Sequence, residues 1–188
     1  NGYIQLDDVL SPEQVNQLRD AVEEATGQPQ RFHQRHEHYD QYANLWTIHE
    51  GVRRHVLSPK VAEFARRLSR SSAIRIWSDQ LLTKMPGGRP SFWHQDVPLW
   101  AMVESGALSC WMALVDVTVD MGCMQFIPGS HRWGRFAWKT LPWDTLETLD
   151  GLRLLVPDDR HDRLQPVAVP LRAGSCTFHD GLMMHYAG

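Results

Sequence analysis

The sequence has little cysteine and no long apolar run. Its three cysteines, Cys110, Cys123 and Cys176, are odd in number and widely spaced, which is typical of reduced thiols rather than of a disulfide framework. The longest apolar run covers residues 110–115; it is too short to cross a bilayer, and no signal-peptide pattern opens the chain. We therefore expect a cytoplasmic protein without membrane insertion.

Basic charge is also scarce. The chain carries 19 Lys and Arg against 22 Asp and Glu, and no basic run is longer than two residues, so there is no electrostatic footprint for nucleic acid. A length of 188 residues suits one domain with a sizeable core. The chain opens on Asn1 and stops at Gly188 without a tail signal. We expect residues 1–188 to be a single domain, truncated or incompletely ordered at its C-terminus; the sequence leaves the oligomeric state open.

Two segments in the first half carry helix start signals. Residues 11–14, Ser-Pro-Glu-Gln, combine a capping serine, a proline at the first helical position and a glutamine that can reach back to the cap. Apolar residues then recur at helical spacing until Gly27, which we expect to end the helix in the left-handed conformation. A second helix is expected from Ser58-Pro59 through Leu68.

After residue 72 the apolar spacing changes to a period of two, which is typical of strands. We expect strands at Ile74–Ile76, Leu81–Leu82, Ser91–Val97, Ser109–Val115, Met124–Ile127, Val167–Val169 and Ser175–Phe178. Several short strands with Gly and Pro turns between them favour an all-β sandwich or barrel. The predicted fold is mainly β with N-terminal helices, a jelly roll whose open mouth suits a small-molecule site.

The pattern His-x-Asp occurs twice. Residues separated by one position on a strand point to the same face, so such a His and Asp can reach one metal ion. The tripeptide at 38–40 lies in a polar tract without strand formers, whereas His94-Gln95-Asp96 follows a turn signal and lies among apolar residues. Only the second context can hold ligands rigidly beside a dry pocket. One further His would complete the two-His-one-carboxylate set that leaves three positions open on non-haem iron.

The periodicity does not decide which histidine is the third ligand. His131 falls in a Pro-Gly-Ser-His turn and His161 in a charged tract. Two candidates are left: His179 ends a strand-like run, and His185 stands at the start of the strand expected next.

Three blocks of sequence together resemble a known family. They are residues 92–96 (Phe-Trp-His-Gln-Asp), 109–118 (Ser-Cys-Trp-Met-Ala-Leu-Val-Asp-Val-Thr) and 121–131 (Met-Gly-Cys-Met-Gln-Phe-Ile-Pro-Gly-Ser-His). In order and spacing they are similar to the phytanoyl-CoA dioxygenase family of Fe(II)- and 2-oxoglutarate-dependent oxygenases. Residues 1–15 resemble the opening of that family, and residues 134–166 are the least familiar part.

The resemblance implies a double-stranded β-helix, the cupin-like jelly roll, with His94, Asp96 and His185 as catalytic metal ligands; His179 is then a supporting histidine. It implies Fe(II), 2-oxoglutarate as cosubstrate and O2. The implied reaction hydroxylates an unactivated C–H bond of a small organic molecule and releases succinate and CO2. Halogenating relatives carry a small residue where this chain has Asp96, so halogenation is not expected.

The resemblance also implies contacts to the cosubstrate. Gln80 and Trp111 match positions that line the 2-oxoglutarate pocket, and Lys84 follows on the strand of Gln80. Core packing is an equally good interpretation of Trp111, and Lys84 also fits a solvated charge at a strand end. The Arg that anchors the distal carboxylate is expected beyond residue 188, and Ala187 stands where the family often has Ser.

Aromatic residues beside the metal motif, Trp93 and Trp100, together with Met102, predict an apolar or amphipathic substrate. The long connections 28–41 and 134–166 are candidate lids. The first contains His33, His36 and His38. We interpret it as a surface loop rather than a metal-binding tract, because histidines without a packed surrounding are not oriented as ligands.

Two alternatives stay open. One is a cupin-like metal enzyme that does not use 2-oxoglutarate, although such proteins usually bring more histidines to the metal than the motif at 94–96 offers. The other is a non-catalytic jelly roll that binds a ligand. Release of succinate would separate both from an oxygenase.

Overall fold

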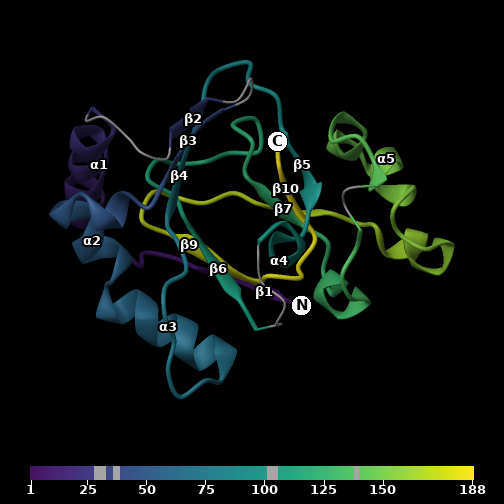
Figure 1. Cartoon of the computed structure of the whole chain (residues 1–188), viewed down its shortest axis with the longest axis horizontal. Helices are drawn as coiled ribbons and strands as arrows, with labels where there is room; N and C mark the ends of the chain where they lie inside the picture. The colour runs from purple at the N-terminus through teal and green to yellow at the C-terminus, as the bar shows by residue number, and fades with distance from the viewer. Residues whose placement is uncertain (28–32, 36–38, 101–105, 138–139) are drawn as a thin grey trace. The chain divides into compact units, whose positions relative to one another are not determined.

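The structure is a computed structural model of the chain (Figure 1). It describes residues 1–27, 33–35, 39–100, 106–137 and 140–188, with the backbone alone at 33–35. The chain divides into two compact units, one formed by Asn1–Asp7 with Pro90–Gly188 and the other by Asp8–Arg89.

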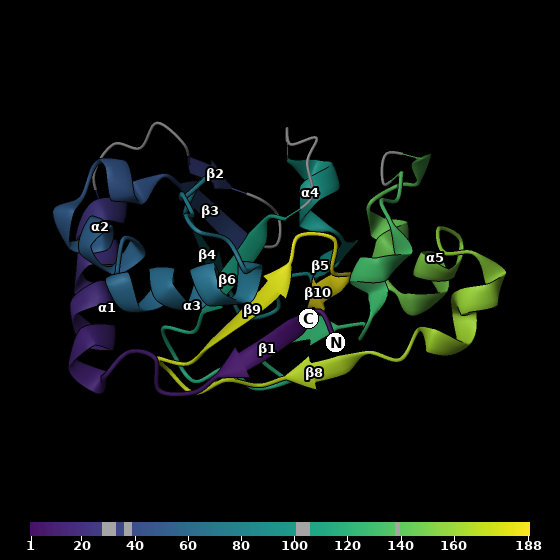
Figure 2. The ribbon, with the colours of Figure 1, turned by 90° about the horizontal axis from the view of Figure 1, so that it is seen from below.

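The unit that contains Pro90–Gly188 holds two antiparallel sheets. One has the strand order β1-β9-β6 and the other β5-β10-β7-β8. Their strands are β1 (Tyr3–Leu6), β5 (Ser91–His94), β6 (Leu108–Met112), β7 (Met124–Phe126), β8 (Val167–Val169), β9 (Cys176–Asp180) and β10 (His185–Ala187). Figure 2 shows β1 and β9 lying side by side, in agreement with their pairing from Tyr3 opposite His179 to Leu6 opposite Cys176.

Apolar side chains from both sheets form the core between them. The buried members of this cluster are Ala113, Met124, Phe126, Val169, Leu171 and Met183. The ring of Tyr3 on β1 stacks on Phe126 of β7 at a centroid distance of 4.5 Å. Because β1 and β7 belong to different sheets, this stack joins the two layers.

Two predicted strands are shorter than expected. β5 ends at His94 and not at Val97, because a short helix, α4 (Asp96–Leu99), begins there. β6 ends at Met112, and the next residues bend, with Val115 exposed. Both errors have one cause: an apolar run looks like a strand in sequence whether or not a neighbouring strand pairs with it.

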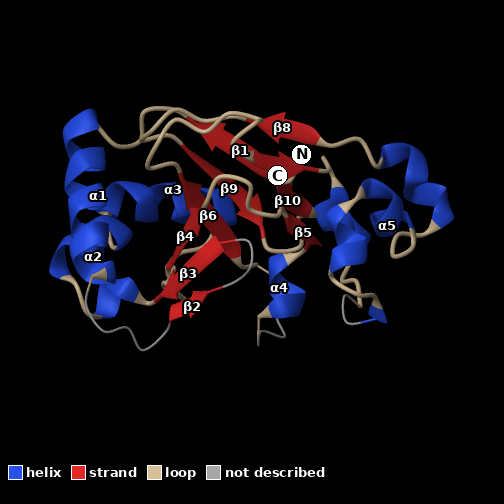
Figure 3. Cartoon of the chain, turned by 90° about the horizontal axis from the view of Figure 1, so that it is seen from above, coloured by secondary structure: helices blue, strands red, loops and turns tan. Residues whose placement is uncertain are grey.

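The connection between β7 and β8 is a packed helical segment. It contains η2 (Ser130–Trp133), η4 (Asp144–Glu147), α5 (Leu149–Arg153) and η5 (Asp158–Arg163). Figure 3 shows these helical turns beside β5 and β10. They close over a second buried cluster formed by Trp93, Ile127, Leu146, Leu152, Val156, Leu164 and Met184. Trp93, predicted to contact substrate, is therefore a core residue.

The second unit consists of helices and a three-stranded sheet of order β2-β3-β4. Its elements are α1 (Pro12–Thr26), β2 (His33–Arg35), β3 (Tyr39–Ala43), η1 (Leu45–Thr47), α2 (Glu50–Val56), α3 (Pro59–Ser69) and β4 (Gln80–Lys84). One buried apolar cluster of this unit consists of Ala21, Ala25, Leu45 and Val52. Among the described residues, no helix combines the length and the apolar character needed to cross a membrane.

The start of α1 is as predicted and its end is not. The amide of Gln14 donates to Ser11 Oγ, and the amide of Ser11 donates to Gln14 Oε1 at 2.9 Å, which is the reciprocal capping box. Gly27 has φ −69° and so lies in the right-handed region. The expected left-handed ending is wrong, because the Gly27 amide already reaches the carbonyls of Glu23 and Ala25 from a helical conformation.

The strands of this unit were predicted poorly. The polar tract interpreted as a loop contains β2 and β3, which pair with β4 through their backbones. Ile74 and Ile76 belong to no strand, and Ile74 is exposed. Main-chain pairing needs no apolar side chain, so the polar tract gave no periodic signal. His36 and His38 lie outside the described residues.

Candidate metal and cosubstrate site

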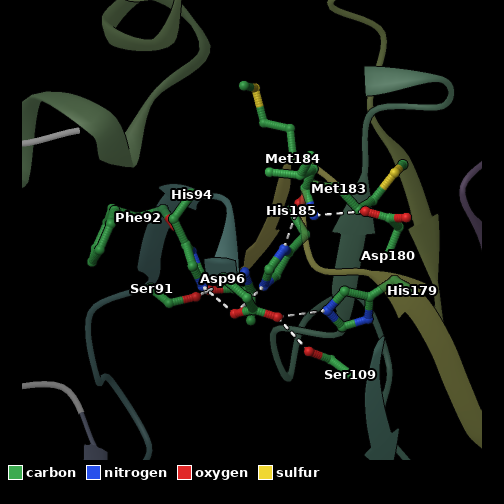
Figure 4. A network of polar contacts seen from close by, with 12 residues as sticks. Ser91, Phe92, His94, Asp96, Ser109, His179, Asp180, Met183, Met184 and His185 are labelled. Carbon is green, nitrogen blue, oxygen red and sulfur yellow. Dashed lines mark hydrogen bonds and ion pairs between the residues drawn. The ribbon is translucent and has the colours of Figure 1, made fainter. Parts of the chain in front are cut away.

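Two neighbouring strands bring the predicted metal ligands together. His94, the last residue of β5, lies directly opposite His185, the first residue of β10, and their ring centroids are 4.1 Å apart. Asp96 follows in α4 rather than on the strand, but Gln95 between them is extended (φ −117°, ψ 140°). The His and Asp side chains therefore still point the same way (Figure 4).

The three side chains form a metal-sized cluster. One ligating atom from each of His94, Asp96 and His185 lies within 4.8 Å of the others. Asp96 Oδ1 is 3.7 Å from His94 Nε2 and 3.6 Å from His185 Nε2. No other group of this kind is found in the described part of the chain.

Hydrogen bonds to the backbone orient both histidines. Nδ1 of His94 is 2.7 Å from the carbonyl oxygen of Phe92, and Nδ1 of His185 is 2.9 Å from that of Met183. A carbonyl can only accept, so in both rings Nδ1 carries the proton. Each Nε2 then presents a lone pair toward Asp96 Oδ1, which is the form a metal requires.

Electrostatics favours the ligating forms. Burial lowers the pKa of His94 and of His185 to about 4, so both rings are neutral at neutral pH. Burial by itself raises the pKa of Asp96, but the electrostatic interaction with nearby His185 and the hydrogen bond from His179 hold that pKa well below its usual range. The cluster thus offers two neutral imidazoles and one carboxylate.

The second oxygen of Asp96 is held from the other side. Ser109 Oγ donates to Asp96 Oδ2 at 2.5 Å, and His179 Nε2 lies 3.2 Å from the same oxygen. His179 is buried on β9, and Ser109 is its direct cross-strand neighbour on β6. We call these two residues the Asp96 clamp. They leave Oδ1 as the oxygen that faces the histidines (Figure 4).

The middle residue of the motif points away from the cluster. Gln95 is fully buried, and its side-chain amide donates to the carbonyls of Gly134 at 2.8 Å and Leu182 at 2.7 Å. Its Oε1 accepts from the amide of Phe136 at 3.0 Å. These three hydrogen bonds to the backbone fix the corner between β5 and α4.

A polar group without a partner lies on the same face of the β6–β9 sheet as the clamp. Thr177 is fully buried two residues before His179, directly opposite Trp111. Its Oγ1 has no hydrogen-bond partner in the structure, and neither has Nδ1 of His179. An unpaired buried hydroxyl costs about 1–3 kcal/mol, and a polar group that bonded to Thr177 would remove this cost.

A sequence model described as phytanoyl-CoA dioxygenase (PhyH) matches residues 1–188. The chain belongs to the phytanoyl-CoA dioxygenase family. Family membership, predicted from the three sequence blocks, is thereby confirmed.

The chain is similar in sequence to a hydroxylase. The methylphosphonate hydroxylase of Gimesia maris is 28% identical over 142 residues, which are 71% of this chain and 54% of that protein. The chain thus spans about half the length of this curated relative.

Solved structures match more completely. The non-haem alpha-ketoglutarate-dependent carbocyclase SnoK from nogalamycin biosynthesis has a TM-score of 0.80 and 30% identity, covering 99% of this chain and 72% of its own. The epimerase SnoN, in complex with Fe3+, alpha-ketoglutarate and nogalamycin RO, has a TM-score of 0.78 and 26% identity, covering 100% and 73%. The predicted jelly roll is confirmed by these matches.

The structure describes most of the other candidate residues named from the sequence of this phytanoyl-CoA dioxygenase family member. Gln80 and Lys84 are on β4 in the Asp8–Arg89 unit, and burial lowers the pKa of Lys84; their role with the cosubstrate stays a prediction. His161 binds the carbonyls of Arg153 and Val156 instead. Trp100 is partly buried, and Met102 lies outside the described residues.

Three residues of the site were missed from sequence: Ser109, Gln95 and Thr177. Serine and threonine are common strand residues with no distinctive spacing. Ser109 and Trp111 are two positions apart on a predicted strand, so the period of two did place them on one face. The pairing of β6 with β9, which brings Ser109 to His179, is a long-range register that one sequence does not reveal.

Proposed function

We propose that this chain is a non-haem Fe(II)- and 2-oxoglutarate-dependent dioxygenase whose metal is held by His94, Asp96 and His185. The observation that carries the proposal is the protonation pattern of the cluster. Both histidines have Nδ1 tied to a backbone carbonyl, and both present Nε2 to one carboxylate oxygen. This donor set fits ferrous iron and leaves coordination positions free.

The residues around the cluster also fit a bound cosubstrate. Iron with 2-oxoglutarate and O2 supplies the oxidising power to break a C–H bond, with release of succinate and CO2. The chain supplies binding and orientation. The hydroxyl of Thr177, which has no partner, is placed on the interior face beside Trp111 to donate to a carboxylate. Gln80 and Lys84 are further proposed contacts to 2-oxoglutarate.

The proposed outcome is hydroxylation of a small organic molecule. The names of the relatives cover a hydroxylase, a carbocyclase and an epimerase, and each of these reactions involves breaking a bond to hydrogen at carbon. Of the three, hydroxylation needs no second reactive group on the substrate. We further propose that residues 1–188 act as one oxygenase domain.

Aromatic side chains beside the metal cluster support an apolar or amphipathic substrate. The ring centroid of Phe92 lies 5.0 Å from that of His94. Trp143 packs edge-on against Phe92 at 4.3 Å and is 61% exposed. Together the rings extend from a metal ligand to the surface, which suits contact with an apolar group.

The test is succinate formation by the full chain, measured with and without added Fe(II) and 2-oxoglutarate. We expect slow turnover that needs both, even without the true substrate. A cupin-like enzyme would bind metal and form no succinate, and a non-catalytic jelly roll would need neither. If no succinate appears under any condition in a protein that binds Fe(II), the proposed activity is wrong.

A further inference from the structure

A cleft separate from the metal cluster lies between two helical turns of the segment that connects β7 to β8. It has a volume of about 370 Å³, which is enough to admit a small molecule. One wall comes from η2 and the residues before it, and the other from η5. The lining residues are Pro128, Gly129, Arg132, Trp133, Asp159, Arg160 and Arg163.

The lining is strongly cationic for this protein. Three guanidinium groups face one carboxylate, that of Asp159, in a chain whose net charge is −3. In the neighbouring acid Asp158, Oδ1 lies 3.7 Å from Nε2 of His161. Asp159 forms no ion pair with any residue that the structure describes. The positive charge of the cleft is therefore left largely uncompensated.

One of the three arginines is fixed in place. Arg160 Nη1 donates to the carbonyl of Trp133 at 3.0 Å, and its guanidinium carbon lies 5.8 Å from the centre of the Trp133 ring. A side chain held at two points has already lost much of the rotational freedom that ligand binding would otherwise cost. Arg160 thus presents its remaining N–H groups in a defined direction.

The side chains of the other two arginines have no partner among the residues that the structure describes. No hydrogen bond or ion pair of the Arg132 or Arg163 side chain is found within the described ranges of the chain. Some helical arginines elsewhere bind an acid three residues earlier, as Arg66 binds Glu63 and Arg153 binds Asp150. At the same spacing Arg163 has Arg160 and Arg132 has Gly129. Asp159, four residues before Arg163, forms no ion pair with it in the described part of the chain, so these donors are available to an external acid.

We propose that this cleft is a binding site for an oxoanion, the phosphate or carboxylate group of a small molecule. The planar guanidinium carries pairs of parallel N–H donors that match the oxygens of either group. Three such groups around one cleft favour a doubly charged anion over chloride. Anion binding at this site requires neither iron nor turnover of 2-oxoglutarate, so it can be tested separately from the proposed function.

The test is isothermal titration calorimetry of the full metal-free chain at constant ionic strength. Inorganic phosphate is titrated in one experiment and malonate, the carboxylate probe, in another. We expect saturable binding of at least one of the two anions. Arg163→Gln and Arg132→Gln should each weaken it about tenfold, the effect of losing one charge-assisted contact. The matched control is Arg153→Gln, which removes the same charge from the same segment outside the cleft and should leave the affinity unchanged.

Each outcome decides the proposal. Binding of one anion only would define the site as phosphate- or carboxylate-specific. Equal weakening by Arg153→Gln would mean that net charge alone attracts the anion, and would overturn the proposal, as would the absence of saturable binding by both anions. Melting curves of the variants check that they are folded. Should one cleft variant fail to fold, the other decides.

Discussion

The two sides of Asp96 are both bounded by a buried histidine, yet the two histidines are set up for different tasks. On the side of Oδ1, His185 has its proton on Nδ1, bound to the carbonyl of Met183, and offers a lone pair at Nε2. On the side of Oδ2, His179 lies 3.2 Å away through Nε2, while its Nδ1 has no partner. A carboxylate only accepts, so Nε2 of His179 carries the proton.

Neither burial nor distance distinguishes the proposed ligand His185 from the proposed supporting residue His179. His179 and His185 are about equally buried, and both reach Asp96. The separating feature is the backbone carbonyl that takes the Nδ1 proton of His185 and leaves its Nε2 free for a metal. His94 has the same feature, and His179 lacks it.

The largest effect is expected on the ligand side. His185→Ala removes one of three metal donors, and we expect affinity for Mn(II) or Co(II), used as probes of the site, to fall by more than about 100-fold, beyond the loss usually caused by removing a supporting residue. Calorimetry of the metal-free chain measures it. The control is His161→Ala, which removes a histidine also bound to backbone carbonyls. Undiminished metal binding by His185→Ala would contradict the ligand assignment.

A smaller effect is expected on the clamp side. His179→Ala leaves all three donors in place and frees one oxygen of Asp96, so metal affinity should fall about 10- to 100-fold. His179→Gln keeps an N–H donor and should recover part of the loss. The electron paramagnetic resonance spectrum of bound Mn(II) should broaden in the Ala variant, because the carboxylate is no longer fixed. A loss as large as that of His185→Ala would make His179 a ligand and erase the difference between the two sides.

Ser109→Ala should weaken metal binding about tenfold, at the low end for a supporting contact. Because Ser109 and His179 hold the same oxygen, their effects should not add: the double variant should lose less than the sum of the two single losses. Ser69→Ala, in the other unit, is the control. Strict additivity would show that the two residues act separately.

The smallest effect on metal affinity is expected at Thr177, where the change should act on stability and on 2-oxoglutarate binding instead. Thr177→Val keeps the shape and removes the unpaired hydroxyl, so the metal-free chain should gain up to about 1 kcal/mol in free energy of unfolding. In the metal-loaded protein the same change should weaken 2-oxoglutarate, measured by titration of the metal-to-cosubstrate absorption band, while 2-oxobutyrate, which lacks the distal carboxylate, should bind as before. Thr177→Ser should restore the preference, and Thr83→Val on β4 is the control. An unchanged preference in Thr177→Val would exclude this contact.

Much of this architecture could be read from sequence where local chemistry decides it. The capping box of α1 depends on residues 11–14 alone, and it forms as predicted. The grouping of His94 with Asp96 depends on three consecutive residues and survives the replacement of a strand by α4, because Gln95 stays extended. Their binding of iron is still a prediction.

The pairing of strands that are far apart in the chain could not be predicted from the sequence. Periodicity left both His179 and His185 as candidates, and the difference lies in register: His185 is opposite His94, whereas His179 is opposite Ser109. The polar strands β2 and β3 were missed for the same reason, since their pairing is made by the main chain. α2 was missed because only Val52 of its seven residues is buried, which gives no helical stripe.

The side chain of Gln95 joins the corner between β5 and α4 to three backbone groups, two of them in the segment after η2. Gln95 recognises only the main chain at Gly134 and Phe136, whereas Arg135 between them donates from its side chain to the carbonyl of Val97 in α4 at 3.3 Å. Substitutions elsewhere in that segment should therefore leave the corner in place, provided that Arg135 and the backbone path of Gly134 and Phe136 are kept.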